Sequence, residues 1–270
     1  MFSKSFIKNL RKKNDDEIIE QIDKQTDLLE KDKEGHDMMW HLIQHNKIDA
    51  VKHLIDLAKK EGCLDKMLNY QDSQGRTRVH QMAFYRALDC LNLLIEEHRD
   101  FFDRQVNKTA HHLETPIYSL VYNPNSKNTI ETLNILLEND AQIQSNSRNK
   151  FLHELAARFD AETFKEFLEV LKDHLEEDKF RELINAQDHD CANNQEDQKV
   201  HRQRSPIFYA IIAEKPENTQ TLIDYGADLE LSDECGLSPE FWLIATPSTI
   251  IGLENAKDLI KDISSRIESQ

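Results

Sequence analysis

Glycine, proline and long apolar runs are all scarce in this chain of 270 residues. It has 6 glycines and 6 prolines, whereas globular proteins use roughly 7% and 5% of these residues. That scarcity disfavours a glycine-rich sandwich or barrel and favours helices joined by short connections. No apolar run approaches the ~20 residues that span a bilayer, and no stretch suits a signal peptide. We therefore expect an all-α, cytoplasmic protein.

Cysteine pairs and a basic surface are also missing. The net charge is −16, which disfavours nucleic acid as a partner because phosphate binding requires concentrated basic residues. We expect a monomer that binds a protein partner. The cysteines form no CxxC pair, so without a secretory signal they indicate reduced thiols in a cytosol-like compartment. They are Cys63, Cys90, Cys191 and Cys235.

The first thirteen residues differ from the rest, because they carry five basic residues and no acid. Phe2, Phe6 and Leu10 recur every four residues, which would form an apolar stripe on a helix. We interpret this segment as a first helix packed on the end of the fold. The alternative is that residues 1–13 contact a membrane surface or act in targeting.

A four-residue pattern recurs six times along the chain. The clearest copies are Thr115-Pro116-Ile117-Tyr118 and Ser205-Pro206-Ile207-Phe208. The copies begin at positions 37, 77, 115, 150, 205 and 238, so the steps between them are 40, 38, 35, 55 and 33 residues. The Thr or Ser that opens a tetrad can cap a helix, and Pro suits the first helical position. Repetition at this period is typical of stacked helical units.

Two further markers keep the same phase. An apolar-x-x-apolar-apolar stretch begins 14 residues after four of the tetrads, as at Leu91, Leu94 and Ile95, and this spacing is that of a buried helix face. Another apolar residue, such as Leu68, lies nine residues before four of the tetrads. Each repeat is therefore predicted to be a helix–turn–helix followed by a polar connecting segment. The 55-residue step implies twelve extra residues within 188–204, which we predict to be an exposed loop.

The tetrads resemble the T-P-L-H signature of ankyrin repeats. The best single match is Leu222-Ile223-Asp224-Tyr225-Gly226-Ala227-Asp228-Leu229, although only His80 and His153 keep the motif histidine. The resemblance implies an ankyrin-repeat solenoid of stacked helix–turn–helix units. It implies capping helices at 1–30, about six degenerate repeats over 31–262, and a tail at 263–270. In its Lys-, Asn-, Gln- and Glu-rich style the chain is similar to ankyrin-type effectors that intracellular bacteria deliver into the host cytosol.

The same resemblance implies that function lies in a surface, with no catalysis, no cofactor and no metal. Ankyrin proteins recognise partners through turn tips and the concave face of the first helices. Among these positions we favour the aromatic ones as anchors, although Phe84 could instead pack against the next repeat. The positions are, at the tips, Gln71, Ser73, Gln74, Lys108, His111, His112, Asn146, Arg148, Glu230 and Glu234, and on the concave face, Gln44, Phe84, Tyr85, Tyr122 and Arg158.

Signatures of common enzymes are missing, since the sequence contains no GxGxxG, GxxxxGK[ST], HExxH or GxSxG motif. His41 and His45 have a metal-capable i, i+4 spacing, but we interpret them as solvent-facing or packing residues. Asp188-His189-Asp190-Cys191 with His201 mixes ligand types at no familiar spacing. Two alternatives stay open, namely an enzyme with an unrecognised active site on a degenerate ankyrin stack, and a structural adaptor.

Overall fold

The computed structural model describes six stretches of the chain, namely residues 10–25, 27–111, 114–123, 127–143, 150–188 and 203–245. These residues fold into helices and contain no β-strand, only an isolated bridge between Lys31 and Asp37. The chain divides into two compact units, Met1–Gln142 and Ile143–Gln270. No helix among the described residues is long and apolar enough to cross a membrane. The prediction of an all-α fold is confirmed.

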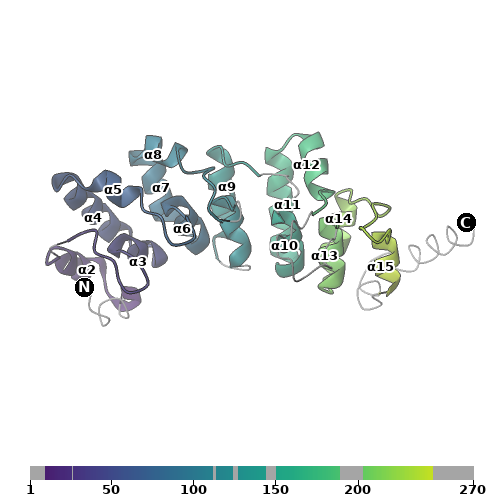
Figure 1. Cartoon of the computed structure of the whole chain (residues 1–270), viewed down its shortest axis with the longest axis horizontal. Helices are drawn as coiled ribbons and strands as arrows, with labels where there is room; N and C mark the ends of the chain where they lie inside the picture. The colour runs from purple at the N-terminus through teal and green to yellow at the C-terminus, as the bar shows by residue number, and fades with distance from the viewer. Residues whose placement is uncertain are drawn as a thin grey trace, which may run out of the picture. The chain divides into compact units, whose positions relative to one another are not determined.

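The N-terminal unit is built from pairs of helices arranged in two layers (Figure 1). First helices pack on first helices, so α3 contacts α6 and α6 contacts η3. Second helices do the same, since α4 contacts α7, and α2 covers α4 at the end of the layer. The elements are η1 (Leu10–Lys12), α2 (Asp15–Ile22), and the pairs α3 (Met38–Gln44) with α4 (Ile48–Lys60), α6 (Arg78–Tyr85) with α7 (Leu88–Glu97), and η3 (Ile117–Tyr122) with α9 (Thr129–Glu138).

The C-terminal unit repeats this plan. Here α10 packs on α13, α13 on α15, and α11 on α14 (Figure 1). The residues that begin the apolar pattern of the second helices are buried, as Phe164, Phe167 and Leu222 show with 0% exposure each. The elements are α10 (Phe151–Arg158) with α11 (Ala161–His174), α13 (Pro206–Ile212) with α14 (Pro216–Asp224), and α15 (Pro239–Ala245).

Three repeats carry a third helix where the sequence predicted only a polar connecting segment. These helices are α5 (Leu64–Leu68), α8 (Arg99–Asp103) and α12 (Glu177–Ile184). Each buries a few apolar side chains, and the expected marker residues Leu68 and Ile184 end two of them at 2% and 0% exposure. The prediction was wrong there, because these segments bury enough apolar surface to fold onto the second helices. They contribute to the long steps of the repeats that contain them, together with the insertion at 188–204 in the fourth repeat.

The first helix of the third repeat is a 3₁₀ helix, η3, rather than an α-helix. It runs from directly after Pro116 to directly before Asn123, which precedes Pro124 in the sequence. A residue before proline is disfavoured in the α conformation, and Asn123 accordingly has φ −135° and ψ 67°. The segment between the two prolines is thus short, and a 3₁₀ helix covers more length per residue than an α-helix.

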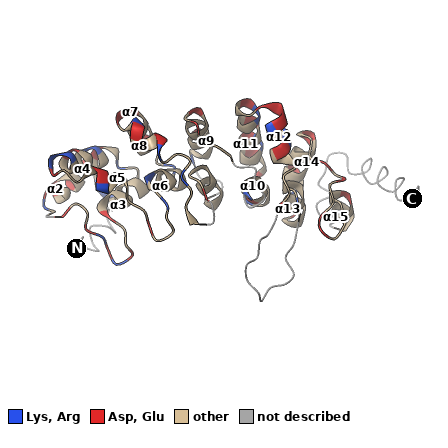
Figure 2. Cartoon of the chain, turned by 45° about the horizontal axis from the view of Figure 1, so that its top comes forward, with Lys and Arg blue, Asp and Glu red and all other residues tan. Residues whose placement is uncertain are grey.

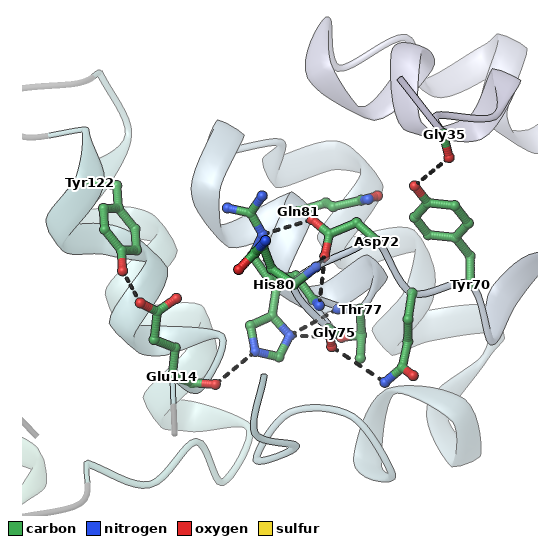
Figure 3. Close-up of polar contacts among 12 residues, drawn as sticks. Gly35, Tyr70, Asp72, Gly75, Thr77, His80, Gln81, Glu114 and Tyr122 are labelled. Atoms are coloured by element: carbon green, nitrogen blue, oxygen red, sulfur yellow. Dashed lines mark hydrogen bonds and ion pairs between the residues drawn. The ribbon is translucent and has the colours of Figure 1, made fainter. Parts of the chain in front are cut away.

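The two motif histidines join neighbouring repeats. The Nε2 atom of His80 donates to the carbonyl of Glu114 at 3.1 Å, while its Nδ1 accepts from the backbone N–H of Thr77 at 3.2 Å (Figure 3). His153 likewise bonds the carbonyl of Arg204 through Nε2 at 2.8 Å. Each carbonyl directly precedes the tetrad of the following repeat. Burial lowers the pKa of His80 to about 4, so the imidazole is neutral in the folded chain at pH 7.

An aspartate closes four of the turns ahead of tetrads, whereas ahead of the third tetrad Ala110 donates to the carbonyl of Glu114 at 2.7 Å. The backbone N–H of Asp72 donates to the carbonyl of Arg76 at 3.1 Å, and Asp32 and Asp233 bond the fourth residue after them in the same way. Asp188 makes this contact with Arg204, sixteen residues further on, at 3.0 Å. The predicted loop at 188–204 therefore starts and ends at a turn of this type. Its residues 189–202, like residues 1–9 and the tail 263–270, lie outside the described residues.

A buried ion pair ties the first repeat to the second. The Arg78 guanidinium, 0% exposed, donates to the carboxylate of Asp37. It also donates to the carbonyl of Met67 and to the side-chain oxygen of Gln81, at 3.1 and 3.2 Å, and lies 4.2 Å from the ring centre of Tyr70. Arg78 takes the place of proline in the tetrad, at the first position of α6.

Candidate partner-binding surface

Five aromatic side chains form a continuous row across the first helices of the N-terminal unit. We call Trp40, Phe84, Tyr85, Tyr118 and Tyr122 the aromatic row. Their ring centres lie 5.4 Å apart from α3 to α6, 4.9 Å apart within α6, 6.3 Å apart from α6 to η3 and 5.9 Å apart within η3. These separations suit edge-to-face and tilted aromatic contacts. The row therefore spans three consecutive repeats.

One side of the row faces the protein and the other faces solvent. Trp40, Phe84, Tyr85 and Tyr118 are half-buried, and Tyr122 is 39% exposed. Phe84 contacts both Tyr85 and Tyr122, so it packs against the next repeat and is still partly accessible. Rings held in this way are partly ordered before any partner arrives, which lowers the entropy cost of binding.

A polar contact fixes the ring of Tyr122 on η3. The Tyr122 hydroxyl donates to the side-chain carboxylate of Glu114 (Figure 3). The backbone carbonyl of the same Glu114 accepts the hydrogen bond from His80. Burial and then this carboxylate raise the pKa of Tyr122, and burial raises that of Tyr85 to about 12. Both phenols are therefore neutral hydrogen-bonding groups at physiological pH.

A small cavity opens beside the row. Its volume of about 60 Å³ is far below the roughly 300–1,000 Å³ of a typical small-molecule site. On its polar side Arg76 pairs with Asp72, Nε to Oδ2, at 2.8 Å. His80 also lines the cavity, but both of its nitrogens are engaged in the helix cap and the inter-repeat bond. The cavity is lined by Trp40, Asp72, Arg76, His80, Gln81, Phe84 and Tyr85.

The turn tips nominated in this unit are exposed. The backbone carbonyl of Gln74 accepts from the N–H of His111 at 2.8 Å, so the second and third tips are joined to each other. Gly75, between them, has a φ of +77°, which only glycine adopts without strain, and it lies against the His111 ring. The exposed tip residues are Gln71, Ser73, Gln74, Lys108 and His111, whereas His112 lies outside the described residues.

The remaining nominated residues do not join the aromatic row. Gln44 is half-buried and lines, with Tyr85, a second depression at the helix–helix turns. Arg158 belongs to the C-terminal unit, where its Nε pairs with Glu154 at 2.6 Å. Glu230 and Glu234 are exposed in that same unit. Asn146 and Arg148 lie outside the described residues.

Sequence reasoning missed two members of the row, Trp40 and Tyr118. Both occupy the fourth position of a tetrad, where the motif histidine stands in His80 and His153. The signal was present, because aromatic residues in place of that histidine were visible as departures from the family pattern. In the structure Trp40 stacks on His36 at 3.7 Å and meets Tyr85 of the next repeat.

Cys90 and His41 are two groups that could act as a nucleophile or as a metal ligand. Burial raises the pKa of the Cys90 thiol to about 12, the opposite of what a reactive cysteine needs. His41 is buried and pairs with Asp32, Nε2 to Oδ2, at 3.0 Å, so its partner is this carboxylate and not His45. With His36, these two residues bring three metal-capable atoms within 4.8 Å of one another.

No protein-family model and no curated protein matches the sequence. Solved structures do match the fold. One chain of the complex between the predatory endopeptidase Bd0816 of Bdellovibrio bacteriovorus and the immunity protein Bd3460 has a TM-score of 0.56 at 18% identity, over 86% of this chain and 99% of that one. The human ASB11 ankyrin repeat domain has a TM-score of 0.56 at 16% identity, over 88% and 90% of the two chains. The ankyrin repeat domain of Bcl-3, a member of the IκB family, has a TM-score of 0.55 at 14% identity, over 85% and 87%. The chain therefore has a divergent ankyrin-repeat fold.

Proposed function

We propose that this chain is a protein-interaction module that binds a partner protein through the aromatic row and catalyses no reaction. The observation that carries the proposal is the continuity of the row over three repeats, with each ring partly accessible. Large aromatic side chains supply most of the binding energy at protein interfaces. A row of them on the first helices offers such anchors on a rigid support.

The chemistry around the row suggests how a partner is held. The 60 Å³ cavity suits part of one apolar side chain of the partner, and the exposed tips Gln74 and His111 offer polar contacts at the rim. Acidic residues are prominent along α11 and α12 of the C-terminal unit (Figure 2). With a net charge of −16, the chain suits a partner whose surface is basic.

The engagement of His80 and the burial of Cys90 favour binding over the enzyme alternative. His80 is the strongly shifted histidine beside the cavity, and its two nitrogens bond Thr77 and Glu114. A general base needs a free nitrogen within reach of its substrate. Cys90 is fully buried and its thiol is protonated at neutral pH.

A site-directed photocrosslinking experiment tests the proposal. The crosslinking amino acid p-benzoylphenylalanine replaces Tyr122 in the row, and in a matched control it replaces Phe241, which is 52% exposed on α15. We expect covalent capture of a partner from lysate at position 122 and not at 241. We expect the variant with Tyr85→Ala and Tyr122→Ala to lose that partner in pull-downs while its circular dichroism is unchanged. Equal capture at both positions, or retention by the double variant, would refute the row as the binding surface.

The origin of the partner is a separate part of the proposal. We propose that the chain acts as a bacterial effector on a host protein in the host cytosol, which rests on the resemblance in style to ankyrin-type effectors. Parallel captures from eukaryotic and bacterial lysates distinguish the two cases. A specific partner from the bacterial lysate alone would overturn the host assignment and leave the binding surface intact.

A further inference from the structure

The first turn of the N-terminal unit places two imidazoles and a carboxylate together. The Oδ2 atom of Asp32 lies 3.0 Å from Nε2 of His41, and the metal-capable atoms of Asp32, His36 and His41 all lie within 4.8 Å of one another. The rings of the two histidines are perpendicular, with centres 6.0 Å apart. We propose that this turn is a Zn²⁺ site with Asp32, His36 and His41 as ligands.

One polar atom in the turn lacks a bonding partner. The Nδ1 atom of His36 is buried and makes no hydrogen bond within the part of the chain that the structure describes. The nearest carboxylate oxygen, Oε2 of Glu34, is 3.6 Å away, which is beyond hydrogen-bond distance. A buried unpaired nitrogen costs stability, and a bound cation is one way to satisfy it. Glu34 is exposed and adjacent, so it or a water molecule can complete four-coordination.

The remaining oxygen of Asp32 orients the carboxylate. Its Oδ1 accepts from the backbone N–H groups of Glu34 and His36 at 2.8 and 2.9 Å, so Oδ2 is directed toward the imidazoles. Tetrahedral Zn²⁺ with bonds of ~2.0–2.1 Å holds its ligand atoms about 3.3 Å apart, so separations of up to 4.8 Å must close by at most about 1.5 Å. That movement falls to the half-buried His36 side chain, because Asp32 and His41 already lie 3.0 Å apart. Imidazole and carboxylate ligands favour Zn²⁺ over Mg²⁺ or Ca²⁺.

The second turn shows what the same geometry does without imidazoles. Asp72 corresponds to Asp32, and Arg76 and Gln81 stand where His36 and His41 stand. There Oδ2 of Asp72 meets Nε of Arg76 at 2.8 Å, so a guanidinium occupies the place of the proposed metal. In both turns Oδ2 of the aspartate faces a nitrogen, which belongs to the guanidinium of Arg76 in the second turn and to the imidazole of His41 in the first. Of the two turns, only the first can bind a metal ion there, because an imidazole nitrogen can give up its proton and arginine stays protonated.

Isothermal titration of the untagged full-length chain with ZnCl₂ tests the site. The two site variants import the residues of the second turn, His36→Arg and His41→Gln, so each has a precedent in the fold. The matched control is His53→Gln, because His53 pairs with a single carboxylate, that of Asp23, at 2.7 Å. We expect one Zn²⁺ per chain, little response to MgCl₂, and binding weakened more than about 100-fold in each site variant.

Thermal unfolding supplies a second readout that depends on the metal alone. Bound Zn²⁺ should raise the melting temperature of the wild type and of His53→Gln, and leave both site variants unchanged. The proposal is overturned if the wild type binds no Zn²⁺. It is also overturned if His36→Arg and His41→Gln, folded by circular dichroism, bind Zn²⁺ as the wild type does. Trp40 of the aromatic row stacks on His36, but the partner-capture test uses none of these variants, so the two proposals can fail separately.

Discussion

Removing one member of the buried pair between Asp37 and Arg78 should destabilise the N-terminal unit strongly. Both side chains are almost inaccessible, at 3% and 0% exposure, so either charge left alone cannot be rehydrated without opening the fold. Breaking a buried ion pair from one side typically costs about 3–5 kcal/mol. We expect a loss of that size for Arg78→Met. We expect a similar loss for Asp37→Ser, which retains an oxygen for the helix cap that Asp37 gives to Trp40.

The double variant separates the ion pair from the packing. With both charges gone, the double variant loses only the hydrogen bonds to Met67 and Gln81. We expect this loss to lower the free energy of unfolding by about 1–3 kcal/mol. The two single losses would sum to about 6–10 kcal/mol, so the double variant should be far more stable than additivity requires.

Urea unfolding at pH 7 in a Trp242→Phe background measures this cycle. The chain has two tryptophans, so Trp40, three residues from Asp37, then reports on the N-terminal unit alone. If the single losses add within about 0.5 kcal/mol in the double variant, the two side chains do not interact and the reasoning fails.

The sequence predicted the helix pairs because burial is periodic in them. The leading residues of the second-helix pattern, such as Leu91 and Leu94, are 0% exposed, as a helix with one buried face requires. The third helices escaped prediction since each is short and rich in charge. In α12 the signal was nevertheless present, because Phe180, Leu183 and Ile184 have the i, i+3, i+4 spacing and are buried.

The buried arginines could not be predicted from sequence. Arginine is mostly exposed in proteins unless it is paired, and the partners of Arg78 lie 41 and 11 residues away in the chain. Arg86 is a second case, because its guanidinium donates to the carbonyls of Leu120 and Asn123 at 2.7 and 2.9 Å. Such contacts depend on how successive repeats stack, which a single sequence does not specify.

The sequence predicted only those residues of the candidate sites whose positions follow from helical register. Phe84, Tyr85 and Tyr122 followed from their register in the first helices, and the structure brings all three together. For His41 the i, i+4 spacing suggested His45 as its neighbour. The turn instead folds over the start of α3 and sets Asp32 against His41, a contact nine residues apart that no helical spacing indicates.

Two further perturbations test the repeat register and its histidines. Leu222→Asp buries an unpaired charge at a site of 0% exposure, so it should lower the melting temperature and unfold more than its own repeat; an unchanged melting temperature would contradict the assigned register. Acid should weaken the fold through His80, whose folded pKa of about 4 lies below its ordinary value of 6.5. As pH falls, the unfolded chain takes up the proton first, so this stabilisation is complete above pH 6.5 and is lost between pH 6.5 and 4, by up to about 3 kcal/mol. Urea midpoints of the wild type and His80→Asn, compared at pH 7 and pH 4.5, isolate this contribution from the carboxylates that both proteins share. If the two proteins lose stability equally over that range, His80 is not held neutral by the fold, and its Nδ1 does not accept from the backbone N–H of Thr77.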